Sequence, residues 1–65
     1  MMEIDELYKR ANKVVGLTGM AVNERLWVSG LMKTFDEARN HNKDLAKTIL
    51  LALKIDGTSI NKILN

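Results

Sequence analysis

The sequence predicts an all-α fold. We expect a compact bundle of three longer helices, over residues 3–15, 22–39 and 43–55, and a short C-terminal helix over residues 59–64. Three observations predict it. Apolar side chains recur at helical spacing in every long segment, and no segment alternates apolar and polar residues as a strand does. The chain also contains no proline, which would interrupt a helix.

An apolar stripe and a glycine define the first predicted helix. The stripe spans about 120° at 100° per residue and consists of Ile4, Leu7, Tyr8, Ala11, Val14 and Val15. Acidic residues in its first turn and Lys13 near its last turn suit the helix dipole. Gly16 then predicts the end of the helix, because glycine adopts the left-handed conformation that often follows a last turn.

The second predicted helix, over residues 22–39, carries a stripe about 140° wide. Its members are Trp27, Val28, Leu31, Met32, Phe35 and Ala38. Its N-cap is expected from Asn23 or Thr18. Gly30 lies in the middle, where glycine costs about 1 kcal/mol relative to alanine. We therefore expect close helix packing or a slight kink at Gly30, and a tolerated glycine at a helix crossing is favoured over a hinge.

The third predicted helix, over residues 43–55, is apolar on two sides. Its main face, about 160° wide, consists of Leu45, Ala46, Ile49, Leu50, Ala52 and Leu53. Leu51 and Ile55 fall outside that face, so we expect this helix to be central in the fold or part of an interface. Residues 40–42 form the break before it, and Thr58 is the expected N-cap of the last helix.

A chain of 65 residues is expected to form one domain over residues 1–65. The core is predicted to contain Tyr8, Leu31, Phe35, Ile49 and Leu53. This length is near the lower end of what folds without a disulfide, a metal or a partner, and the chain has no cysteine. The apolar faces must therefore be buried efficiently within one chain or between chains, and a homodimer is one expected state.

Two groups of functions are unfavoured by the composition. The acidic N-terminus lacks the features of a signal peptide, and the longest apolar run, residues 49–53, is far shorter than the roughly 18 residues of a membrane span. We therefore expect a cytoplasmic protein with no membrane partner. His41 is the only imidazole and has no carboxylate at a ligand spacing, and the glycines match no phosphate-binding motif. We expect no catalytic, cofactor or metal site, and hence no enzyme.

One segment resembles short bacterial proteins. Residues 23–27 read Asn-Glu-Arg-Leu-Trp, residues 30–31 are Gly-Leu, and residues 35–38 read Phe-Asp-Glu-Ala. These proteins share an Asn-Glu-Arg-Leu-aromatic opening, a Gly-Leu pair and a Phe-Asp-x-Ala close, and often have threonine where this chain has Ala21. The resemblance does not cover the first helix. It implies a bacterial origin and a compact helical fold, and it carries no activity with it.

By elimination, the sequence favours a non-catalytic module that binds another protein or a second copy of itself. A small bacterial regulator or inhibitor, of the antitoxin or immunity type, would be such a module. The candidate interface residues are Val22, Leu26, Trp27, Leu51 and Ile55. All but Trp27 are apolar positions that the main helical faces do not use. For Trp27 we weigh an interface anchor against burial in the core, and burial is favoured.

The alternative hypothesis is a nucleic-acid-binding domain. Lys43, Lys47 and Lys54 fall within about 40° on the third predicted helix, and Arg39 extends the row. The break over residues 40–42 also has the length of a helix-turn-helix turn. However, a solvated helix face has the same pattern, the row has no interleaved aromatic residues, and the net charge is only +2.

Overall fold

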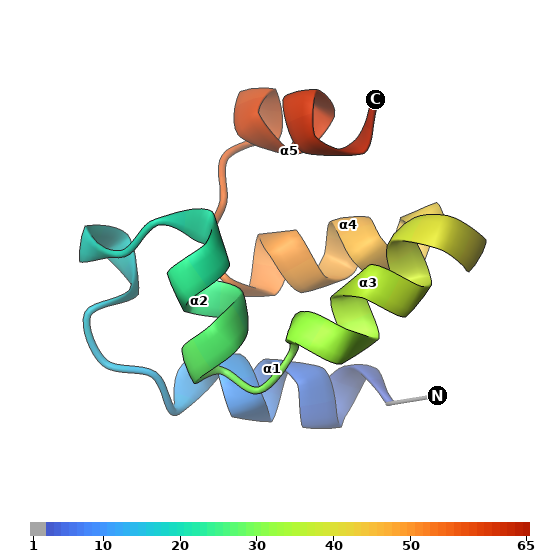
Figure 1. Cartoon of the computed structure of the whole chain (residues 1–65). Helices are drawn as coiled ribbons and strands as arrows, with labels where there is room; N and C mark the ends of the chain where they lie inside the picture. The colour runs from blue at the N-terminus through green and yellow to red at the C-terminus, as the bar shows by residue number, and fades with distance from the viewer. Residues whose placement is uncertain (1–2) are drawn as a thin grey trace.

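The computed structural model describes residues 3–65, and these residues form an all-helical fold with no strand (Figure 1). The predicted fold class is therefore confirmed. In chain order, the elements are α1 (Ile4–Asn12), the 3₁₀ turn η1 (Leu17–Gly19), α2 (Val22–Val28), α3 (Met32–His41), α4 (Lys43–Ala52) and α5 (Gly57–Leu64).

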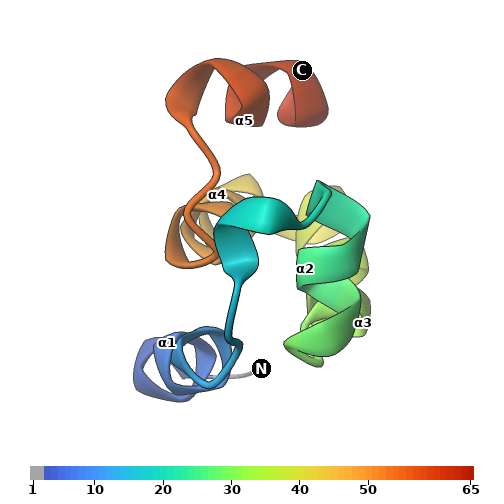
Figure 2. The same cartoon turned by 90° about the vertical axis from the view of Figure 1, so that its left-hand side faces the viewer.

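Helix α4 is the centre of the fold. It packs against α3, α1 and α5, while α2 packs against α3. Figure 2 shows α1 and α4 on one side, α2 and α3 on the other, and α5 above them. Half of the α4 residues are buried, namely Leu45, Ala46, Ile49, Leu50 and Ala52. Its neighbours bury the main apolar face, whereas Leu51 on the opposite side is exposed and Ile55 is buried from the turn after the helix.

The core is mainly aliphatic. Leu31, Phe35, Ile49 and Leu53 are buried as predicted, but Tyr8 is 40 % exposed, so its assignment to the core was wrong. Helix α1 turns Leu7 and Ala11 inward. Successive residues on a helix are about 100° apart, which places Tyr8 on the flank of the buried row. Leu17, which lies in none of the predicted helices, is also buried, from the 3₁₀ turn.

The predicted helix over residues 22–39 is in fact two helices. Gly30 adopts a left-handed conformation with φ of 74°. Its N–H donates to the Trp27 carbonyl at 3.1 Å, and the Leu31 N–H donates to the Leu26 carbonyl at 3.0 Å. This pair of bonds is a Schellman motif, which ends α2 and reverses the path of the chain. Gly30 is therefore neither a tolerated mid-helix residue nor a slight kink.

The same motif ends α4, with a lysine where glycine is usual. Lys54 has φ of 64° and its N–H donates to the Leu51 carbonyl at 3.0 Å. The Ile55 N–H donates to the Leu50 carbonyl at 3.0 Å. The helix predicted to run to residue 55 therefore stops at Ala52. Because only glycine adopts this conformation without steric cost, Lys54 stores strain in the turn.

Other helix boundaries also differ from the predictions. Helix α1 ends at Asn12 rather than residue 15, and α3 extends to His41. The N-cap of α2 is Ala21, with no side-chain cap, so neither Asn23 nor Thr18 fills that role. Each of these differences reflects backbone geometry at a helix end, which apolar periodicity does not define.

The last helix begins two residues before its predicted start. Its N-cap is Asp56, not Thr58, and the Asp56 carboxylate accepts from the Ser59 N–H at 3.1 Å and from the Ser59 hydroxyl at 2.7 Å. The pKa of Asp56 lies below its usual value, first because of the hydrogen bond from the Ser59 hydroxyl and second because of the one from the Ser59 N–H. The capping bonds stabilise the charged carboxylate, which in turn suits the helix N-terminus.

Arg25 joins three parts of the fold. Its Nε donates to the Met20 carbonyl at 3.0 Å, before α2 begins. Its Nη1 donates to the Leu53 carbonyl at 3.0 Å and to the Lys54 carbonyl at 3.2 Å, at the end of α4. A guanidinium at a helix C-terminus satisfies carbonyls that have no partner within the helix and complements the helix dipole.

The two left-handed residues predict opposite effects of substitution. We expect Gly30→Ala to lower the free energy of unfolding by about 1 kcal/mol. The alanine methyl group has room, but alanine adopts the left-handed backbone conformation only at a steric cost. Lys54→Gly should raise the free energy of unfolding by about 0.5–1 kcal/mol, because it relieves the strain. Urea unfolding followed by far-UV circular dichroism measures both. Changes of the same sign would contradict the role of the left-handed conformation.

We predict that substitution of Arg25 has a large effect on stability, although the side chain is half-exposed. Arg25→Met keeps most of the aliphatic stem but loses three hydrogen bonds, and should lower the free energy of unfolding by about 2–4 kcal/mol. Arg25→Lys should lower the free energy of unfolding by roughly half as much, because an ammonium can still donate to one of these carbonyls. As a control, Arg39→Met on the exposed side of α3 should stay within about 0.5 kcal/mol of the wild type. Equal effects at both positions would contradict the role of Arg25.

Candidate interaction site

The most prominent surface feature is an exposed tryptophan. Trp27 is 75 % exposed on α2, so the favoured assignment to the core was wrong. The reason is the break at Gly30. Helix α2 turns Leu26 inward, and Trp27 is rotated by about 100° from it, toward solvent. The stripe predicted across residues 22–39 does not exist as one surface, because its two halves belong to different helices.

The structure divides the five predicted interface residues. Trp27 and Leu51 are exposed, and Val22 is half-buried against the core. Leu26 is only 2 % exposed and Ile55 is also buried, so neither side chain is accessible to a partner. Both belong to the Schellman motifs at the ends of α2 and α4, in which apolar residues flank the left-handed turn and pack together. The sequence patterns placed both residues outside the main apolar faces of their helices only because both helices were predicted too long.

The helix that carries Trp27 is anchored at both ends. Arg25 ties it to the end of α4, and the Schellman motif fixes its C-terminus. Near that C-terminus, Arg10 of α1 donates from Nη1 to the Gly30 carbonyl at 3.4 Å, and Arg10 is itself paired with Glu6 at 3.3 Å. Trp27 therefore projects from a fixed piece of backbone.

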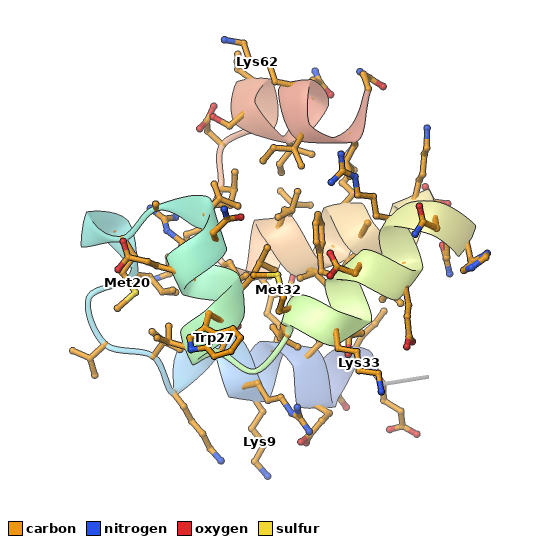
Figure 3. All side chains as sticks on the ribbon, viewed as in Figure 1. Lys9, Met20, Trp27, Met32, Lys33 and Lys62 are labelled. Carbon is orange, nitrogen blue, oxygen red and sulfur yellow. The ribbon has the colours of Figure 1, made fainter. Side chains whose placement is uncertain are left out.

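Figure 3 shows the surroundings of Trp27. The indole lies on the outer side of α2, with Met32 and Lys33 of α3 to one side, while Lys9 points down from α1. Val28, the next residue along α2, is also exposed. We call the surface made by Trp27 and Val28 the Trp27 face. It is a small apolar surface, with Lys33 of α3 to one side.

The four basic residues of the alternative hypothesis do not form one row. All are exposed, but Lys54 lies in the left-handed turn after α4 rather than on the helix. Lys43 and Lys47 share a side of α4, with Asp44 adjacent to Lys43 in its first turn. Arg39 belongs to α3. The predicted helix-turn-helix turn over residues 40–42 was also wrong, because Asn42 alone separates α3 from α4.

The described residues, 3–65, show no pocket and no cluster of three or more side chains that could hold a metal ion. His41 lies exposed at the end of α3. None of the helices in this part of the chain combines the length and the apolar character needed to cross a membrane.

Comparison with known proteins adds no relative. No protein-family model, curated protein or solved structure matches the chain. The resemblance of residues 23–38 to short bacterial proteins therefore stays a prediction. Within that segment, the structure gives Arg25 and Gly30 clear structural roles and leaves Trp27 without one.

Because Trp27 is the only tryptophan, its exposure can be measured directly. We expect fluorescence emission typical of solvent-exposed indole, which acrylamide quenches almost as well in the folded as in the unfolded protein. Trp27→Ala should change the free energy of unfolding by no more than about 0.5 kcal/mol. Its neighbour provides the control, since Leu26→Ala should cost about 2–5 kcal/mol. Blue-shifted emission that moves to longer wavelength on unfolding would instead place Trp27 in the core.

Proposed function

We propose that the protein is a non-catalytic module that binds another protein through the Trp27 face. One observation carries this proposal: a tryptophan that is 75 % exposed on an anchored helix. An indole side chain can bury roughly 150–250 Å² in a contact, and tryptophan is enriched among the residues that dominate binding energy. The exposed indole adds nothing to the core, so its apolar surface is available to a partner.

The anchoring of α2 favours tight binding through a small surface. Binding costs free energy when loops and side chains become ordered, and that cost is small where the backbone is already fixed. Arg25, Arg10 and the turn at Gly30 hold α2 before any partner arrives. The indole has only two side-chain torsions to restrict. These features support a preformed contact rather than one that folds on binding.

The charges around the Trp27 face suggest the chemistry of the partner. Lys33 of α3 lies to one side of the indole (Figure 3), and the one ion pair within residues 3–65 joins Glu6 to Arg10, so Lys33 has no acidic partner within ion-pair distance. A complementary surface would offer an apolar pocket for the indole and an acidic side chain near Lys33. A small cytoplasmic regulator or inhibitor of another bacterial protein, of the antitoxin or immunity type, fits this proposal.

Protein binding is favoured over nucleic-acid binding by the arrangement of the charges. Lys54 is separate from the helical row, and Asp44 lies beside Lys43. The exposed side of α3 carries Asp36 and Glu37, which would repel a phosphate backbone. Trp27 lies on α2, outside the row of basic residues, so it does not supply the aromatic contact that the row lacks.

The test is a comparison of partners captured by matched variants. The wild-type chain should enrich one or more proteins from the cells that produce it, and Trp27→Ala should lose them because it removes the indole and leaves the fold intact. Val15→Ala is the control, since Val15 is apolar and exposed but lies outside the Trp27 face. Titration of the purified partner should then shift the Trp27 emission to shorter wavelength.

Two outcomes would contradict this function. The first is capture of the same proteins by Trp27→Ala as by the wild type. The second is a nucleic-acid complex in a gel-shift assay at about 50 mM salt with protein up to roughly 100 μM, a range in which non-specific nucleic-acid binders are detected. Loss of that complex in Lys43→Ala and Lys47→Ala would then establish the alternative function.

A further inference from the structure

A second apolar surface lies on α1 and α4. Ile4 is 56 % exposed, Tyr8 is 40 % exposed, and Leu51 on α4 is 48 % exposed. Ile4 and Tyr8 are four residues apart, so they lie on one side of α1. Leu51 lies on the side of α4 opposite its buried residues. The fold buries none of these three side chains, although each is large and apolar.

The arrangement of the helices brings these side chains to one face. Helices α1 and α4 pack together, and Figures 1 and 2 show them side by side and running in the same direction. Helices α2 and α3 lie on the other side of this pair (Figure 2). Following each right-handed helix from its buried residues places Ile4, Tyr8 and Leu51 away from α2 and α3. We call this the α1–α4 outer surface, and it does not include Trp27.

Helix α1 has a charge distribution that suits a second copy of itself. Its first half and N-cap are acidic, with Glu3, Asp5 and Glu6, whereas Lys9, Arg10 and Lys13 follow. In an antiparallel pair of α1 helices, the acidic half of each faces the basic half of the other. A parallel pair would bring like charges together. Asp5 and Lys9 are available for this role, because only Glu6 and Arg10 form an ion pair within residues 3–65.

We propose that two copies of this chain associate through the α1–α4 outer surface about a two-fold axis. The α1 helices pack antiparallel, with Tyr8 near the axis and Asp5 of each copy beside Lys9 of the other. Leu51 of each copy extends the apolar contact. An isologous contact of this kind needs one self-complementary surface, which the acidic-to-basic order along α1 provides.

The size of the surface sets the strength of the dimer. Three partly exposed apolar side chains per copy are well short of the roughly 800 Å² per partner of a stable complex. The dimer is therefore weak and reversible, and forms at high micromolar concentrations. It is independent of the proposed function, since the Trp27 face stays free in both copies.

The first test is sedimentation of the full chain at concentrations from about 10 μM to 1 mM, which spans weak association. The weight-average mass should rise from that of one chain toward that of two. Tyr8→Lys and Leu51→Lys should each keep the mass at that of one chain, while Trp27→Lys should leave the association unchanged. A wild-type chain that stays monomeric at every concentration overturns the proposal, as does association that only Trp27→Lys abolishes.

A charge exchange tests the geometry. Asp5→Lys and Lys9→Asp should each raise the dissociation constant by at least about tenfold, because each places two like-charge contacts across the two-fold axis. The double variant restores opposite charges and should return to within about threefold of the wild type. It also places charges against the dipole of α1, so restoration cannot come from a more stable helix. A double variant as weak as either single variant would overturn the antiparallel pairing.

Discussion

The fold depends on a guanidinium that serves as the end cap of another helix. Arg25 on α2 donates to the Leu53 and Lys54 carbonyls at the end of α4, and to the Met20 carbonyl before its own helix. These carbonyls have no partners in their own elements, and water can reach a half-buried site only in part. Arg25 therefore fixes the angle of α2 against the central helix, and with it the direction in which Trp27 points.

Two left-handed turns complete this arrangement. The turn at Gly30 separates α2 from α3, and the turn at Lys54 ends α4 where Arg25 can reach its carbonyls. Both turns bury the apolar residues around them, including Leu26 and Ile55, so the core is extended by the helix ends as well as by the helix faces. Position 54 adopts the left-handed conformation with a lysine, so the burial and the hydrogen bonds of the turn outweigh the local strain in its backbone.

Much of the fold could be predicted from sequence, and most of the candidate site could not. Apolar spacing identified the helical regions and the buried Leu31, Phe35, Ile49 and Leu53, because those residues face inward over several turns of a helix. Trp27 and Tyr8 were assigned inward on the same evidence and are exposed. Tyr8 lies at the edge of its stripe, where a rotation of tens of degrees decides between core and solvent, and Trp27 belongs to a stripe that the break at Gly30 divides between two helices. Periodicity alone does not measure that rotation.

The sequence by itself determined an all-α chain without a strand signal and the approximate helical regions. These follow from composition and local spacing. Only the tertiary structure decided that residues 22–39 form two helices, that Arg25 caps α4, and that Trp27 and the α1–α4 outer surface face solvent. The physical reason is that a helix end depends on its partners: Gly30 can continue or stop a helix, and the burial gained by turning Leu26 and Leu31 into one core decides which.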